Sequence, residues 1–197
     1  MRKHIRILSV IMLSMLLCTA CTNKDERYVK RLKQFSQEYR AELNDIVSFV
    51  QEQNILNRMK IIYEADNLLY YSISSSEPVE KHVIMCDDMA LLFKKGFVHD
   101  IVTDHLRGSD KRGILMFNIG GYGNFSASTD FVLYYSTDNK PVCLDCYFVY
   151  RDIPLIKHND GWIITDDPEI RRRVEIRNLQ YYTEQLTDHW FFAIVKY

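Results

Sequence analysis

Two cysteines three residues apart, Cys143 and Cys146, form the first combination in the sequence that could do chemistry. A CxxC pair serves as a redox couple at the start of a helix, or as half of a zinc site when a second ligand pair exists. This pair lies in a β-rich run, and the sequence after residue 21 has no second CxxC and no HxxxH motif. Buried or unpaired thiols are therefore the leading interpretation. A structural disulfide, with Cys86 as a third candidate, comes next, and a redox or metal site last.

The segment HDIVTDH, from His99 to His105, is the second candidate site. On a strand the two histidines would share one face and Asp104 would lie on the other, because side chains alternate. A metal ion would need a further ligand such as His82 or Glu80. Acidic and histidine side chains beside a hairpin turn are usually solvated, so a metal or catalytic site here is the minor alternative.

Other motifs of chemistry are not found in the sequence. No G-x-S-x-G or H-E-x-x-H motif occurs, and the Gly-rich stretch 120–123 lacks the lysine of a phosphate loop, so it is interpreted as a flexible turn. Arg171 to Arg173 could touch anionic headgroups, but Glu169 and Glu175 flank them and favour a solvated helix face. We therefore expect no cofactor and lean against an enzyme.

The charge balance argues against nucleic-acid binding. The formal net charge is −1, and without the first twenty residues 22 basic side chains face 26 acidic ones. A protein that binds nucleic acid needs a basic excess or stripe to neutralise phosphates. We expect no nucleic-acid partner.

The first twenty residues have the three regions of a secretory signal peptide. Arg2, Lys3 and Arg6 make the start positive, an apolar run spans residues 7–17, and small residues fill 18–20. The apolar run is shorter than the roughly 18–20 residues that a membrane-spanning helix needs. The segment therefore predicts export of the chain.

The stretch LCTAC, residues 17–21, resembles the lipobox of bacterial lipoproteins. In that family, small residues precede a cysteine whose thiol receives a diacylglycerol before the leader is cut off. Thr19 and Ala20 match the two positions before the cysteine, whereas Cys18 stands where the family usually has Leu. The resemblance implies lipidation at Cys21, detectable with labelled palmitate, and a protein anchored on the extracytoplasmic face of the cell membrane. A plain secretory signal cut after Ala20 is the alternative.

These features divide the chain into a signal peptide of residues 1–20, a lipidated cysteine with a tether at 21–27, and one α+β domain at 28–197. An apolar stripe at spacings of three and four predicts a helix from about 28 to 52. It packs on a sheet in the preferred interpretation and forms a dimeric coiled coil in the alternative. A second helix is predicted over about 79–95.

Strand-like segments fill most of the remaining chain, and a short helix is predicted after Asp166 or Asp167, with Pro168 as its first residue. We expect an antiparallel sheet built from hairpins, with one long and one or two shorter helices on one face. The predicted hairpins span 58–75 with its turn at Asp66-Asn67, 97–120, 130–150, 154–165 and 179–197.

The C-terminal third, from Asp130 to Tyr197, contains FVLYYSTDNKPV, NDGWIIT and YYTEQLTDHWFF. These segments resemble uncharacterised secreted or lipid-anchored proteins of Gram-positive bacteria. The second Asp of that family's turn is Asn139 here, and Phe131 and Tyr134 are two residues further apart than the corresponding aromatic residues. The resemblance implies a compartment and a fold type, and it assigns no catalytic residue.

Aromatic residues are enriched in the strand-like runs. Most should be core, and a surplus on an uncovered sheet face would mark a protein or glycan partner site. The residues concerned are Tyr134, Tyr135, Tyr147, Phe148, Tyr150, Tyr181, Tyr182, Trp190, Phe191 and Phe192.

The sequence as a whole predicts a membrane-anchored lipoprotein of the bacterial envelope with a non-catalytic binding domain. An envelope hydrolase or metal-dependent enzyme that uses His99, Asp104 and His105, or the cysteine pair, is one alternative. An inhibitor or immunity-type protein is another.

Overall fold

The computed structural model describes residues 24–52, 59–72, 82–104, 113–124, 127–144, 150–151, 153–173 and 179–197. The predicted signal peptide, Cys21, His105 and Cys146 lie outside these ranges.

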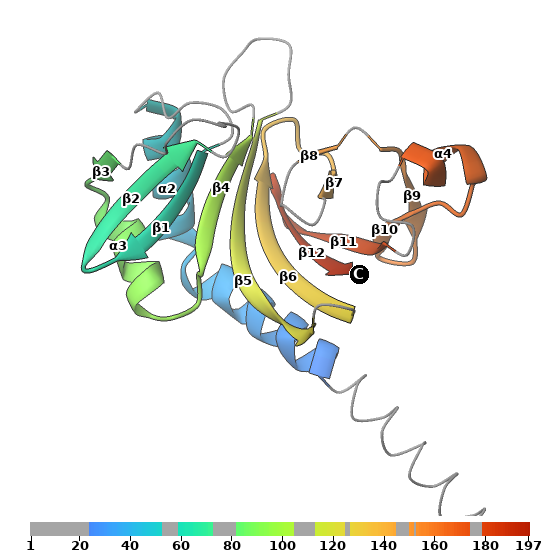
Figure 1. The fold of residues 1–197 in the computed structure, drawn as a ribbon, viewed down its shortest axis with the longest axis horizontal. Helices are drawn as coiled ribbons and strands as arrows, with labels where there is room; N and C mark the ends of the chain where they lie inside the picture. The colour runs from blue at the N-terminus through green and yellow to red at the C-terminus, as the bar shows by residue number, and fades with distance from the viewer. Residues whose placement is uncertain are drawn as a thin grey trace, which may run out of the picture.

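A ten-stranded antiparallel sheet dominates the described residues, in the order β3-β2-β1-β4-β5-β6-β12-β11-β10-β9 (Figure 1). Two short strands, β7 and β8, pair with each other separately. The α+β class and the antiparallel sheet are as the sequence predicts. The strands are β1 (Met59–Glu64), β2 (Asn67–Ser72), β3 (His82–Ile84), β4 (Asp100–Asp104), β5 (Ile114–Asn124), β6 (Ala127–Ser136), β7 (Cys143–Leu144), β8 (Tyr150–Arg151), β9 (Leu155–His158), β10 (Gly161–Ile164), β11 (Gln180–Thr187) and β12 (Trp190–Lys196).

The N-terminal helix, residues 24–38, is followed directly by α2 (Arg40–Glu52), with Tyr39 as the only break. The Tyr39 carbonyl accepts a hydrogen bond from the Leu43 amide at 2.9 Å, and the Tyr39 amide donates to the Phe35 carbonyl at 3.0 Å. The helical hydrogen bonding therefore continues across the break. The predicted start at residue 28 is too late, because the chain is already helical at residue 24, the first described residue. Residues 24–27, predicted as part of a tether, are helical.

The second predicted helix is wrong in its first half. Residues 82–84 form β3, and α3 (Asp87–Lys94) begins only after the extended Cys86, whose φ is −149°. The aspartates at 87 and 88 occupy the first turn, where the helix dipole favours negative charge. Gly96 ends the helix with a φ of +69°, a conformation that glycine adopts without steric cost. The predicted C-terminal boundary is therefore confirmed.

The segment after β6 does not fold back on β6. β6 pairs with β5 on one side and with β12 on the other, and β7 pairs with β8 instead. Two buried phenols hold the β7 segment against the sheet. The Val142 amide donates to the Tyr134 hydroxyl at 3.3 Å, and the Tyr181 hydroxyl donates to the Val142 carbonyl at 2.6 Å. The predicted hairpin over 130–150 is wrong for this reason.

Three of the tight connections can be compared with their predictions. The β1–β2 turn is Ala65-Asp66, one residue earlier than predicted, and both residues have positive φ as a primed two-residue turn requires. The predicted β9–β10 turn at Asn159 is confirmed. Residues 120–123, predicted as a turn, instead belong to β5 beyond a bulge at 118–120.

The last helix and the last two strands follow the prediction. α4 (Pro168–Arg173) has Asp167 before it, and the Asp167 carboxylate accepts the Glu169 amide at 2.7 Å. β11 and β12 form the predicted C-terminal hairpin.

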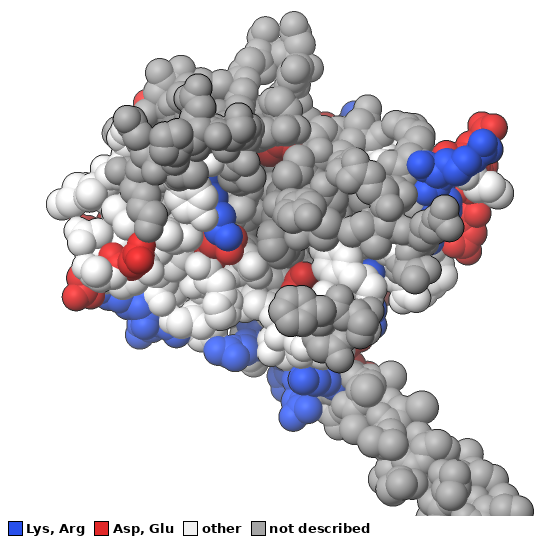
Figure 2. Space-filling view, viewed as in Figure 1, with Lys and Arg blue, Asp and Glu red and all other residues white. Residues whose placement is uncertain are grey.

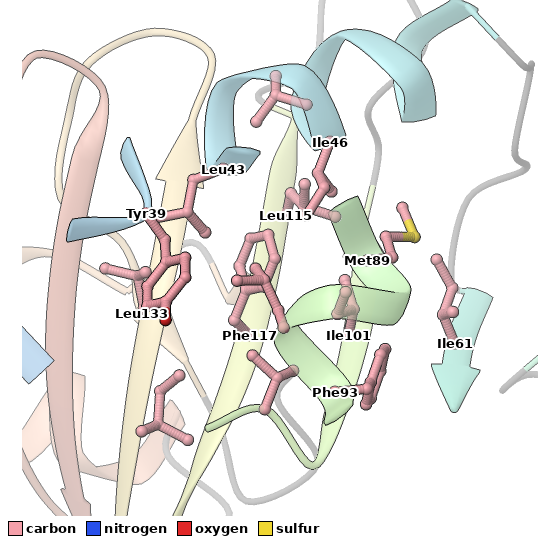
Figure 3. Packing of buried hydrophobic residues seen from close by; sticks show 14 of the residues in the cluster. Tyr39, Leu43, Ile46, Ile61, Met89, Phe93, Ile101, Leu115, Phe117 and Leu133 are labelled. Carbon is pink, nitrogen blue, oxygen red and sulfur yellow. The ribbon is translucent and has the colours of Figure 1, made fainter. Parts of the chain in front are cut away.

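The sheet buries apolar side chains on both faces. The N-terminal helix, α2 and α3 cover one face, where Leu43, Met89 and Phe117 meet (Figure 3). The β7 segment covers part of the other face, where Tyr134 and Phe191 stack at 5.2 Å between ring centres. Along β12, Trp190 and Phe192 point to the helix face while Phe191, Ala193 and Val195 point to the opposite one, as the period of two predicts.

Candidate functional site

A groove follows the flank of the N-terminal helix where this helix lies beside β11 and β12. We call it the helix–sheet groove. Its more enclosed section, of about 340 Å³, is lined by Ser36, Gln37 and Arg40 from the helices and by Glu184 and Trp190 from the strands, among others. A shallower section of about 530 Å³ continues along the helix toward its start. Lys33 and Gln37 line both sections, so the two form one continuous surface.

A charge pair spans the groove from wall to floor. The Lys33 ammonium donates to the Glu184 carboxylate at 2.6 Å, and the Tyr182 hydroxyl donates to the other Glu184 oxygen at 3.0 Å. Lys33 also lies over the Phe192 ring at 5.4 Å. Desolvation and the hydrogen bond to Glu184 raise the pKa of Tyr182 to about 12, so this phenol is a neutral donor at physiological pH. The floor of the groove is therefore close to electrically neutral.

Arg40 supplies the remaining charge of the enclosed section. Its side chain is exposed, and among the described residues it makes no ion pair. A guanidinium presents several donors in one plane, which suits carboxylate groups and peptide carbonyls. Gln37 adds an amide at the same wall.

Trp190 forms the apolar base of the enclosed section. Its ring is almost fully buried, and its Nε1 donates to the Asn44 side chain at 3.0 Å. Among the described residues, neither histidine nor cysteine lines the groove. Amides, hydroxyls, one guanidinium and an indole are groups that could hold a ligand through hydrogen bonds and packing.

The predicted histidine site does not assemble among the described residues. His99 is exposed just before β4, and its Nε2 lies over Gly120, where a Cβ would come within 2.9 Å. Asp104 is five residues further along, at the other end of β4, about 17 Å away at the rise of a strand. His82 lies three strands away, about 14 Å. His105 and Glu80 are not described.

A metal site is not found in the described part of the chain. No group of three or more His, Cys, Asp or Glu side chains there could hold a metal ion. Among the described residues, the metal candidate His99 is therefore not part of a group of ligands that could hold a metal ion.

The cysteine candidates are separated by the sheet. Cys86 is a free, half-buried thiol on the helix face, whereas Cys143 is fully buried on the opposite face and its Sγ lies 3.9 Å from the Leu144 carbonyl. A disulfide between these two is excluded because the sheet lies between them. Burial raises the pKa of the Cys86 thiol, the opposite of what a redox cysteine needs. Cys146 is not described.

Most of the aromatic residues in the strands are core. Tyr135 and Tyr182 are half-buried, and the side chains of residues 147, 148 and 150 are not described. The buried ones are Tyr134, Tyr181, Trp190, Phe191 and Phe192. No broad aromatic face is exposed within the described strands, so the candidate surface is the groove rather than an open sheet.

The sequence pattern contains only part of the signal for this groove. Tyr182, Glu184 and Leu186 alternate on one face of a strand, which is visible in YYTEQL. Lys33, however, is 151 residues away from Glu184, and no local pattern connects them. Sequence reasoning missed Lys33, Arg40 and Glu184 for this reason.

Comparison of the chain with protein-family models, with curated proteins and with solved structures finds no match in any of the three. Among the helices of the described residues, none is both long enough and apolar enough to cross a membrane.

Proposed function

We propose that this protein is a lipoprotein of the bacterial envelope, anchored through Cys21 at the extracytoplasmic face of the cell membrane. Its folded domain binds a protein or glycan in the helix–sheet groove and performs no catalysis. The observation that carries the binding role is the groove itself, where Arg40, Gln37 and Trp190 converge beside the neutralised Lys33–Glu184 pair.

The anchor rests on the resemblance of LCTAC to a lipobox and on the positive, apolar leader that precedes it. The position of the N-terminal helix is consistent with an anchor near the domain. Residue 24 is already helical and lies only three residues after Cys21, a separation of at most about 11 Å. Two or more acyl chains would hold such a protein stably on the bilayer.

Replacement of Cys21 by Ser is expected to abolish labelling with palmitate and to release the protein from the membrane fraction. The diacylglycerol is attached through the cysteine sulfur, which serine lacks. The measurement is metabolic labelling with intact mass of the extracted protein. Cys18→Ser is the matched control and should keep full labelling, and labelling that survives in Cys21→Ser would refute the anchor.

A photo-reactive amino acid at Gln37 is expected to cross-link a partner in intact envelopes, whereas one at Ser48 should not. Gln37 is an exposed residue of the groove wall, while Ser48 is also exposed, on α2, and does not line the groove. When Arg40→Glu is added to the variant that carries the photo-reactive residue at position 37, the cross-linked adduct should decrease severalfold. Equal adducts at both positions, or none at Gln37, would contradict a binding role for the groove.

A further inference from the structure

The flank of the N-terminal helix opposite the groove carries an uninterrupted set of cations. Lys24, Arg27 and Arg31 lie at helical spacings of three and four, and with Tyr28 they line one shallow hollow. The helix rises about 10 Å from the first to the last of them. Arg31 lies 4.9 Å over the Phe97 ring, in the loop that follows Lys94 and Lys95.

These contacts join the two sets of cations into one surface, which we call the basic strip: Lys24, Arg27, Arg31, Lys94 and Lys95. Figure 2 shows Lys and Arg side chains along the lower edge of the molecule, from below α3 to the start of the N-terminal helix. Within the described part of the chain, Lys24, Arg31, Lys94 and Lys95 have no ion pair with a carboxylate. Their charge is therefore not neutralised by the fold.

Aromatic rings hold several of these cations in place. The Lys24 ammonium lies 4.1 Å from the Tyr122 ring centre, and the Lys94 ammonium lies 5.8 Å from that of Tyr63. Asp25, the carboxylate nearest in sequence to Lys24, is paired with Lys196 at 2.7 Å. The nearby Glu26 lines the groove flank of the helix. The basic strip is thus a fixed positive surface on a chain whose net charge is negative without its leader.

The position of the strip relative to the chain end identifies what it would meet. Lys24 is three residues after Cys21, about 11 Å at full extension, which is close to the Debye length of about 10 Å at 0.1 M salt. A lipid on Cys21 would hold the strip within electrostatic reach of the headgroups of the same bilayer.

We infer that the basic strip docks the domain on anionic phospholipid headgroups and so fixes its orientation on the membrane. The inference rests on the proposed lipid anchor at Cys21. Each cation near an anionic surface adds attraction that corresponds to about a fivefold change in binding. Docking by this strip also fixes the helix–sheet groove, because the groove runs along the other flank of the same helix.

Lysine footprinting on the lipidated protein tests this inference. The full protein is reconstituted into vesicles of phosphatidylcholine with phosphatidylglycerol, or of phosphatidylcholine alone, and amines are acetylated with a water-soluble reagent. Lys24, Lys94 and Lys95 should react at least fivefold more slowly on the anionic vesicles, because one docked cation alone accounts for about that factor. Lys140 and Lys157, exposed on other parts of the molecule, should react equally on both. Raising the salt from about 0.1 M to about 1 M should remove the protection.

A charge-reversed pair provides the second arm. Lys94→Glu with Lys95→Glu should restore rapid acetylation of Lys24 on anionic vesicles, whereas Lys140→Glu with Lys157→Glu should leave Lys24 protected. All four positions are exposed, so circular dichroism should show unchanged folding.

The outcomes separate the two proposals. Protein that does not float with either vesicle lacks the anchor, which overturns the lipoprotein assignment and this inference with it. Protein that floats but shows equal acetylation of the strip on both vesicles, or equal protection of Lys157, overturns the docking surface alone.

Discussion

Replacing Phe117 or Phe191 with Ala is expected to lower the free energy of unfolding by about 3–5 kcal/mol each. Phe117 is fully buried on the helix face, 5.7 Å from the Trp190 ring centre. Phe191 is fully buried on the opposite face, against Tyr134. Each substitution removes a whole ring from a close-packed cluster and leaves a cavity.

The two variants should also unfold in a single transition, because both clusters are built on the same strands, β5, β6 and β12. Urea unfolding followed by fluorescence and by circular dichroism measures both quantities. Ile156→Ala is the control. Its side chain is 46% exposed on the edge strand β9, and the expected change is within about 0.5 kcal/mol. Two separate transitions in the Phe191 variant would show that the faces are independent units.

Alkaline pH is expected to destabilise the fold steeply above pH 10. Burial raises the pKa of Tyr134 and of Tyr181 well above the ordinary value of 10. In the unfolded chain both phenols ionise near pH 10, whereas in the folded chain they stay protonated. Their contribution is therefore fully present below pH 10 and is lost as the pH rises from there toward the folded pKa values.

The size of the effect follows from proton linkage. Each such tyrosine contributes about 1.4 kcal/mol per pH unit, so Tyr134 and Tyr181 together should contribute about 2.7 kcal/mol per pH unit above pH 10, to which Tyr182 adds its own share up to its pKa of about 12. Urea unfolding at several pH values from 9 to about 11.5 measures it. Tyr181→Phe should lower the slope by about 1.4 kcal/mol per pH unit. It should also cost about 1–3 kcal/mol at neutral pH, because the buried Val142 carbonyl loses its donor. An unchanged slope in this variant would show that Tyr181 is not the titrating group.

The hydrogen-bond directions around these phenols are fixed by their partners. The Thr183 hydroxyl donates its single proton to the Phe192 carbonyl at 2.7 Å. The Tyr134 hydroxyl lies 2.8 Å from the Thr183 oxygen and must therefore be the donor of the bond between them. The Val142 amide then uses the Tyr134 oxygen as its acceptor.

Local sequence patterns predicted those elements whose boundaries depend on neighbouring residues. The stripe from Leu32 to Val50 marks the buried side of a helix, and alternation in β12 separates the two faces of the sheet. Asn159 and Gly96 mark chain reversals because few residues adopt positive φ at low cost. The predictions failed where long-range pairing outweighed local preference, as at β3, where VEKHVIMCDD has an apolar pattern compatible with a helix.

The sequence by itself determined the class of fold, the buried faces of the long helix and of the C-terminal strands, and the likeness of residues 17–21 to a lipobox. Each of these features depends on residues that are close together in the sequence. The tertiary structure alone decided which strands are neighbours, which cysteines are kept apart and where a ligand could bind. β6 meets β12 across about sixty residues, and Lys33 meets Glu184 across 151. Contacts at such separations come from the packing of the whole sheet against its helices, and no short stretch of sequence contains both partners.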